Sequence, residues 1–304
     1  GEAWVAEAQR IHCKEGGLKM MSAKTFFIVV TVVAACDAFA GMQTAPLRLR
    51  GGEAWVPSAA KDSFAIPDGR RVCVLAEEKD IAGAVVECVE TIGAAAIAEK
   101  GAFSLAIPGG SVVKALKGVK PTSMDFTKVH VFFCNERIGE YKCYKTAMES
   151  LKDLGIPESQ IYKVGEGEPG VVAAAYEAMM CSQPESVCGK TEAGIPRVDL
   201  MLLGTGEDGH VGSIHPKSDE VKAAGTGQIV LPIDKDGKKS IAVSMDFMSS
   251  SKMVLLSAAS AKRAGMVASA LKGTFEADNC PAALVRAADT LWVCDTGSIA
   301  EYKQ

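Results

Sequence analysis

The chain has 304 residues, of which 48% are hydrophobic and 23% are charged. This composition is that of a globular protein with ample length for a large core. The formal net charge of −4 argues against a nucleic-acid partner, because nucleic-acid-binding proteins usually present a basic face. The ten cysteines include no C-x-x-C pair, and we interpret them as reduced core residues rather than disulfide partners or metal ligands.

Residues 1–61 are predicted to be an N-terminal extension, with Met20 as the natural start. The apolar run at 26–35 is too short to span a bilayer and has the length of the hydrophobic part of a signal peptide. Small residues at Ala38 and Ala40 and an acid-poor stretch with two arginines follow. This order resembles the two-part plastid presequences of algae with complex plastids. We therefore expect a plastid protein with no membrane segment in its mature form, and the secretory pathway or the cytosol are the alternatives.

The remainder, residues 62–304, alternates strand and helix patterns. Short apolar runs predict strands at 72–76, 103–107, 129–134, 198–203, 253–257 and 291–294. Apolar residues at helical spacing predict helices at 80–100 with Asp80 as N-cap, at 144–154, 171–180 and 260–271, and a short one that ends at Leu116. This alternation predicts one α/β domain with a mostly parallel, doubly wound, Rossmann-like sheet. In such folds the functional loops follow the carboxyl ends of the strands.

The predicted strand at 103–107 is followed by Gly109, Gly110 and Ser111. Two glycines allow the backbone to approach a bound anion, and the Ser111 hydroxyl and the first N–H groups of the next helix can donate to it. A tight turn that requires positive φ is the other interpretation of these glycines.

Charged residues follow two further predicted strands. Glu136 and Arg137 come after 129–134 and can form a preset pair, whose guanidinium suits phosphate or carboxylate. Lys262 stands in the expected first turn of the last long helix, where a cation opposes the helix dipole. That placement is explained if Lys262 and the helix N-terminus bind an anion together. For Glu136 and Arg137 the alternative is a surface ion pair. For Lys262 the alternative is an exposed lysine that contacts only water.

The strand at 198–203 leads into GTGEDGH, which has the G-x-G-x-x-G spelling of a dinucleotide-binding turn. A dinucleotide site requires a helix that opens at the third glycine. Pro216 and Gly225 interrupt the stretch 210–228, and no apolar stripe develops there. We therefore expect no bound dinucleotide at this loop.

His210 at the end of this loop is a candidate general base, because histidine titrates near neutral pH and can take a proton from water. Asp208 can orient its imidazole or contact substrate hydroxyls. A structural histidine is the alternative, which the glycine-rich loop disfavours. His210 and His215 have no nearby cysteine and do not stand at i, i+4 spacing, so we expect no metal site. Together the strand ends predict a small phosphorylated, hydroxyl-rich substrate and a proton-transfer or hydrolytic reaction.

The order of these motifs resembles the 6-phosphogluconolactonase family, within the wider glucosamine-6-phosphate isomerase/deaminase superfamily. The match covers roughly residues 70 to 300, and its most specific part is Asp208-Gly-His210. The resemblance implies hydrolysis of the δ-lactone of 6-phosphogluconate in the oxidative pentose phosphate pathway, without a cofactor. It implies that His210 is the general base that activates water. The substrate- and phosphate-binding residues that it implies are Gly109, Gly110, Ser111, Glu136, Arg137 and Lys262.

Several positions depart from the family pattern, including the three that follow and an Arg that is replaced around Lys239 and Ser240. Asn135 stands where the family usually has Asp, Ala259 where it has Gly, and His215 where it has Phe. In the deaminases the first position supplies a carboxylate that abstracts a substrate proton, which an amide cannot do. A lactonase is therefore favoured. A deaminase or isomerase of amino-sugar phosphates, or a sugar-phosphate-binding protein without activity, are the alternatives, and the pattern makes no prediction of oligomeric state.

Overall fold

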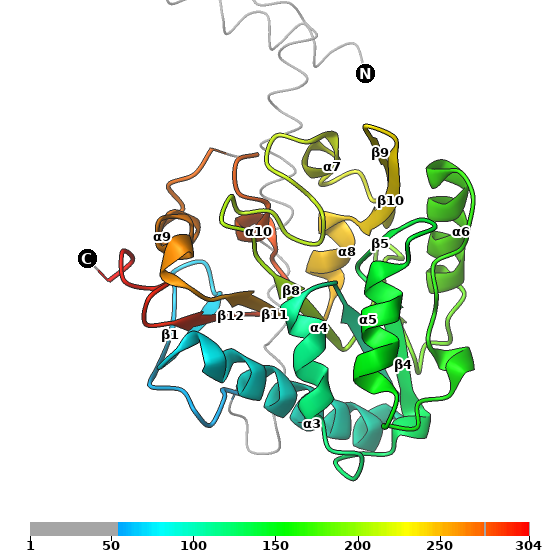
Figure 1. Ribbon diagram of the computed structural model, residues 1–304, viewed down its shortest axis with the longest axis horizontal. Helices are drawn as coiled ribbons and strands as arrows, with labels where there is room; N and C mark the ends of the chain where they lie inside the picture. Colours follow the sequence, from blue (N-terminus) through cyan, green and yellow to red (C-terminus); the bar gives the residue numbers. More distant parts are fainter. Residues whose placement is uncertain (1–53, 277, 304) are drawn as a thin grey trace, which may run out of the picture. The chain divides into compact units, whose positions relative to one another are not determined.

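A computed structural model describes residues 54–276 and 278–303. In this part of the chain a central sheet has the strand order β1-β2-β12-β11-β8-β3-β4. Strand β1 (Asp62–Ala65) pairs antiparallel with β2, and all other neighbours in this sheet are parallel. The predicted α/β domain with a mostly parallel sheet is confirmed (Figure 1). Most of the predicted N-terminal extension lies outside the described residues.

The other strands of the central sheet are β2 (Arg71–Leu75), β3 (Phe103–Ile107), β4 (Val129–Phe133), β8 (Leu200–Gly204), β11 (Met253–Ala258) and β12 (Asp289–Asp295). Two small antiparallel sheets consist of β5 (Asn135–Arg137), β10 (Lys238–Val243) and β9 (Val230–Lys235), and of β6 (Gly189–Lys190) and β7 (Pro196–Arg197). The α-helices are α3 (Ile81–Lys100), α4 (Ser111–Ala115), α5 (Lys142–Leu151), α6 (Pro169–Cys181), α7 (Asp219–Lys222), α8 (Met245–Ser250), α9 (Ala264–Lys272) and α10 (Pro281–Leu284). Short 3-10 turns are η1 (Glu78–Asp80), η2 (Leu116–Gly118), η3 (Phe126–Lys128), η4 (Glu158–Gln160) and η5 (Ala261–Arg263).

Helices cover both faces of the central sheet. Figure 1 shows α3 and α4 on one face and α8, α9 and α10 on the other. This burial explains why β3, β8 and β12 are mostly apolar and are buried along nearly their whole length, without the alternation of a half-exposed strand. Among the described helices, α3 alone is long and apolar enough to cross a membrane by length and composition. In the structure it contacts β3, β8 and β12, so its apolar face belongs to the core.

The two ends of α3 illustrate what a sequence pattern can specify. Gly101 follows the last turn with φ of 79°, the left-handed conformation that ends many helices. Asp80 is the N-cap residue, but its side chain makes no capping bond to α3. Its carboxylate instead accepts the N–H of Glu77 at 3.0 Å, across the turn η1. The preceding 3-10 turn therefore replaces the expected side-chain cap.

The folded domain begins before the predicted boundary at residue 62. Trp55 is buried, and its carbonyl accepts a 2.7 Å hydrogen bond from the guanidinium of Arg71. Arg71 also pairs with Asp289 at 2.7 Å, which connects β2 to β12. All the cysteines in the described part of the chain are free thiols, and all but Cys181 are buried. The seven buried thiols thus lie in the core, as the sequence predicts.

Candidate active site

The four strands whose ends carry unusual residues are consecutive neighbours in the sheet, in the order β11-β8-β3-β4. They are parallel, so their carboxyl ends meet at one edge. The loops that follow them contain Lys262, His210, the Gly109–Ser111 segment, and Arg137. The structure therefore brings together the four segments that the sequence indicated.

The loop after β8 folds back on itself and ends at His210. Thr205 pairs with Val211 in an antiparallel bridge, and the N–H of Gly206 donates to the carbonyl of His210 at 2.9 Å. Gly209 has φ of 86°, a left-handed conformation that favours glycine. No helix begins within residues 205–218, all of which the structure describes. The loop therefore lacks the helix that a dinucleotide-binding turn requires at its third glycine.

His210 and Asp208 form a close pair at the tip of this loop. The Nδ1 atom of His210 lies 2.6 Å from Oδ1 of Asp208, and the backbone N–H of His210 donates to the same oxygen at 3.1 Å. Because an ionised carboxylate can only accept, the ring proton of a neutral His210 is on Nδ1 and Nε2 keeps a free lone pair. Partial burial alone would raise the pKa of Asp208, but the hydrogen bonds from His210 outweigh it and lower that pKa.

Gly206 leaves room for the close contact between His210 and Asp208. A Cβ atom at Gly206 would overlap the ring of His210 and the carboxylate of Asp208. Gly206 does not have a positive φ, so the need for glycine here is steric rather than conformational. Gly206 therefore serves a close side-chain pair, although the G-x-G-x-x-G spelling alone indicates a pyrophosphate site.

His215 also reaches this pair, which the sequence analysis did not anticipate. A two-residue turn at Gly212 and Ser213, both with positive φ, places His215 opposite His210 in a short hairpin. The ring centroids are 4.6 Å apart, and Nδ1 of His215 lies 3.6 Å from Oδ2 of Asp208. The expectation of no metal site rested on helical spacing, which does not apply across a hairpin turn.

The glycine loop after β3 leads directly into α4. Gly110 is the N-cap residue of α4 with φ of 83°, so it needs the freedom of glycine. A Cβ at Gly109 would lie 2.9 Å from Sγ of Cys143, so this glycine permits close packing against α5. Burial raises the pKa of that thiol to about 12, so Cys143 is a neutral packing group. Ser111 is exposed at the first position of α4. This geometry is compatible with both an anion site and a tight turn.

Glu136 and Arg137 do not form the pair that the sequence suggests. The carboxylate of Glu136 is buried and accepts N–H groups of Arg137, Cys143 and Tyr144 at 2.7 to 3.1 Å. It thereby caps the start of α5, because the first N–H groups of a helix lack backbone partners. The guanidinium of Arg137 instead pairs with Glu140 at 3.1 Å and is partly exposed. Arg137 is thus available to solvent, whereas Glu136 acts on the local backbone.

Lys262 lies before the last long helix rather than in its first turn. It is exposed in η5, and α9 begins at Ala264. No ion pair or hydrogen bond of its ammonium group is found among the described residues. Sequence reasoning overlooked the next residue, Arg263, whose guanidinium donates to the carbonyls of Thr205 and Ala259 at 2.9 and 2.7 Å. Arg263 therefore joins the loop after β8 to the loop after β11.

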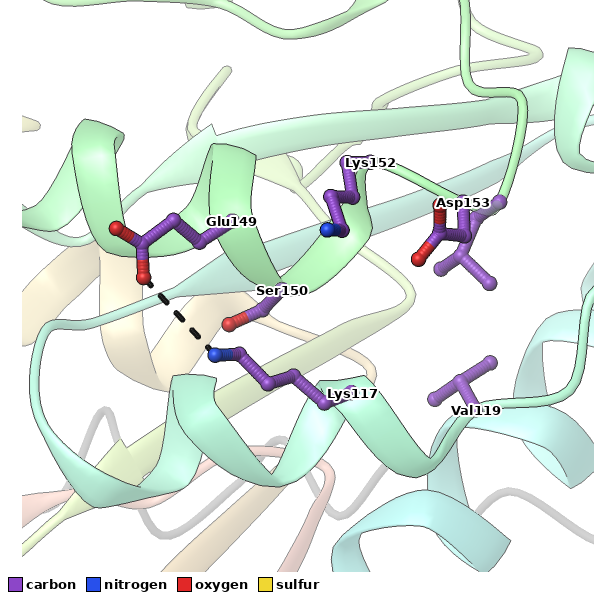
Figure 2. A pocket seen from close by; sticks show the side chains of 7 residues that line it. Lys117, Val119, Glu149, Ser150, Lys152 and Asp153 are labelled. Atoms are coloured by element: carbon purple, nitrogen blue, oxygen red, sulfur yellow. Dashed lines mark ion pairs between the residues drawn. The ribbon is translucent and has the colours of Figure 1, made fainter.

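Two hollows in the described residues help to locate a substrate. One has a volume of about 300 Å³. It lies beside Lys117 and Glu149, between the segment that follows α4 and the far end of α5 (Figure 2). Since both helices start at the site and run away from it, this hollow lies distant from the four loops. The second, of about 400 Å³, includes Glu207, Asp208 and Glu276 in its lining. Its acidic lining repels phosphate, which favours the side with Arg137 and Lys262 for the anion.

The sequence matches the family described as glucosamine-6-phosphate isomerases/6-phosphogluconolactonase over residues 76–292. This match covers most of the chain and includes all four loops. The chain belongs to this family.

Relatives in the family include a probable chloroplastic 6-phosphogluconolactonase from rice (Oryza sativa subsp. indica), which is 35% identical over 46% of each chain. A 6-phosphogluconolactonase from Nostoc is 26% identical over 68% of this chain and 87% of its own. The chain thus spans about half the length of the rice relative. A solved 6-phosphogluconolactonase from Trypanosoma brucei shares the fold, with a TM-score of 0.64, 20% identity, and coverage of 75% of this chain and 97% of the other.

Proposed function

We propose that the protein hydrolyses 6-phosphoglucono-δ-lactone to 6-phosphogluconate. The observation that carries this proposal is the pair formed by His210 and Asp208 at the tip of the loop after β8, at 2.6 Å. The pair lies in a chain whose family comprises lactonases and isomerases. The names of the rice and Nostoc relatives favour the lactonase.

In the proposed mechanism, Nε2 of His210 takes a proton from water while the water oxygen attacks the C1 carbonyl of the lactone. The tetrahedral intermediate then collapses, the bond from C1 to the ring oxygen breaks, and the imidazolium returns its proton to that oxygen. Asp208 stabilises the imidazolium and keeps the proton of the neutral ring on Nδ1. General-base catalysis of this kind contributes about 10²- to 10⁴-fold, which is useful for a lactone that already opens unaided.

The phosphate of the substrate is proposed to bind between the loops after β3, β4 and β11. Arg137 and Lys262 would supply the positive charge, and Gly110 and Ser111 would supply N–H and hydroxyl donors. Glu136 would act indirectly, because its carboxylate fixes the backbone that presents Arg137. These assignments are supported by the partial exposure of Arg137 and the exposure of Lys262 at the same sheet edge.

The test compares two substrates with the same purified chain. Acid release from freshly prepared 6-phosphogluconolactone is expected to exceed the spontaneous rate. Ammonia release from glucosamine 6-phosphate is expected to be absent. Asn135 supports this choice, since its amide donates to Sγ of Cys143 at 3.6 Å and offers no carboxylate to abstract a substrate proton. Ammonia release would instead establish a deaminase.

We also propose that the protein acts in a plastid. The rice relatives described as chloroplastic support this location, as does the apolar and arginine-bearing composition of residues 26–50. A fluorescent fusion to the complete N-terminal region is expected to reach the plastid. Accumulation in the cytosol or secretion would contradict the proposal.

A further inference from the structure

The hairpin that holds His215 opposite His210 creates a cluster of three potential metal ligands. One donor atom each from Asp208, His210 and His215 lies within 4.8 Å of the others. Val211 and Ile214 exchange backbone hydrogen bonds of 3.1 and 2.8 Å and close the turn. Because the residues just outside such a pair face each other, the two imidazoles meet across the hairpin.

The geometry of the cluster suits a small divalent ion. A tetrahedral site with ligands at about 2.0 to 2.2 Å needs donor atoms roughly 3.3 to 3.6 Å apart. The distance from His215 Nδ1 to Asp208 Oδ2 is already 3.6 Å. The distance of 2.6 Å between His210 Nδ1 and Asp208 Oδ1 requires only a small rotation to widen. The side chains of all three residues are 39% to 50% exposed, so an ion can enter and retain water.

The donor types select the class of ion. Two imidazole nitrogens and one carboxylate oxygen suit zinc and similar transition metals, whereas calcium and magnesium prefer oxygen alone. The surroundings also favour a cation, since Glu207 and Glu276 line the hollow that borders Asp208. His215 stands where the family pattern has Phe, so the third ligand distinguishes this chain from that pattern.

We propose that Asp208, His210 and His215 bind a zinc-type divalent ion, and that the bound ion inhibits the enzyme. The inhibitory part rests on the proposed function. An ion on Nδ1 of His210 takes the lone pair there, so the ring proton must reside on Nε2, which can then no longer accept a proton from water. An ion on Nε2 blocks the base directly. Either mode also removes Asp208 from its hydrogen bond with the imidazole.

Binding is tested with the full chain after treatment with a chelator. Cobalt(II) is added, and visible absorption reports its coordination, with zinc as the competitor. We expect one tetrahedral site per chain, and at least tenfold weaker binding by His215→Phe. His130→Phe is the matched control, because His130 lies elsewhere and contacts Tyr162 at 2.9 Å. Equal binding by wild type and His215→Phe, or a thiolate-to-cobalt band that indicates cysteine ligands, would overturn the site.

Inhibition is tested in the lactonase assay, with each variant compared with its own metal-free rate. Saturating zinc is expected to lower the wild-type rate more than tenfold, and a chelator is expected to restore it. The zinc concentration for half inhibition should rise in His215→Phe by the same factor as the cobalt affinity falls. Stimulation by zinc, or equal sensitivity of both proteins, would overturn the inhibitory role. A chain without lactonase activity would overturn that role and the proposed function, while the cobalt titration would still decide the site.

Discussion

The Nδ1 atom of His210 lies 2.6 Å from the Oδ1 atom of Asp208, within a loop that closes on itself by a hydrogen bond from Gly206 to His210. The residues that form the pair are only two positions apart, so the loop builds it locally. The loop is in turn held from outside, because Arg263 binds the carbonyl of Thr205 and the N–H of Ala282 donates to the carbonyl of Gly209. A histidine and aspartate that pair within one loop, on a backbone held by contacts from other segments, form the arrangement expected of a positioned base.

Asp208→Asn is expected to lower kcat by about ten- to a hundredfold with a smaller change in KM. An amide cannot stabilise the imidazolium, and it does not fix the ring proton on Nδ1. Steady-state kinetics on the lactone would measure this effect. Glu207→Gln is the matched control, since Glu207 is the exposed neighbouring carboxylate. Equal losses in both variants would point to the charge of the loop rather than to the pair.

Gly206→Ala is expected to reduce activity while the protein stays folded. The added methyl group overlaps His210 and Asp208, so the pair must separate, but no backbone strain arises because φ is not positive. Activity and thermal unfolding should be measured together. Gly170→Ala is the control, because a Cβ there meets no atom within 4 Å. An active Gly206→Ala enzyme would show that the close pair is dispensable.

Lys262→Ala is expected to raise KM by about tenfold, the effect of losing roughly one charge-assisted hydrogen bond, with little change in kcat. Its affinity for inorganic phosphate as a competitive inhibitor should fall in parallel. Lys117→Ala removes an equally exposed cation beside the distant hollow of Figure 2 and should change neither value. Parallel losses in the two variants would indicate general electrostatic attraction instead of a phosphate site.

Asp68 gives a prediction about stability and pH. Burial would raise the pKa of Asp68, but hydrogen bonding to Arg70 and the charges of Arg70 and Arg286 outweigh it and lower that pKa below its ordinary value of 3.8. A lowered pKa means that the ionised carboxylate stabilises the fold above about pH 4 and that this contribution disappears as pH falls through the folded-state pKa. Urea unfolding should therefore show a deficit for Asp68→Asn at pH 7 that shrinks towards pH 3. A deficit independent of pH would contradict the ionic origin.

Asp199 is expected to be a strong determinant of stability. Its buried carboxylate lies 3.0 Å from Lys100 and 3.1 Å from Lys252, and accepts from the N–H and hydroxyl of Ser104. Asp199→Ala leaves the partly buried ammonium groups of Lys100 and Lys252 without their carboxylate partner and should cost about 3 kcal/mol in the free energy of unfolding. Asp219→Ala removes an exposed partner of Lys222 and should have little effect in the same urea titration.

The sequence predicts six of the seven strands of the central sheet, because these strands are largely buried and read as mostly apolar runs. It does not reveal the edge strand β1, which is largely exposed. It does not reveal the sheet β5-β10-β9, since half of β9 is exposed and Pro232 interrupts its pattern. The turn at Asp236 and Gly237, both with positive φ, is nevertheless a recognised hairpin signal that could have identified β9 and β10. Exposed strands are therefore better found by their turns than by their apolar residues.

The candidate site likewise contains features that the sequence predicts and features that it does not. The four loops are predictable because parallel strands bring their ends to one edge, whatever the intervening sequence. The partners of individual side chains cannot be predicted in this way, because they depend on tertiary contacts. Arg137 pairs with Glu140, and Glu136 caps α5. The meeting of His210 and His215 depends on the turn at Gly212 and Ser213, which a search for helical ligand spacing does not test.

The most direct test of the central claim is the rate of acid release from fresh 6-phosphogluconolactone by wild type and by His210→Ala, each corrected for spontaneous hydrolysis. We predict a clear catalysed rate for wild type and a loss of about 10²- to 10⁴-fold in the variant, with thermal unfolding unchanged. A wild-type rate equal to background, or a fully active His210→Ala protein, would contradict the account.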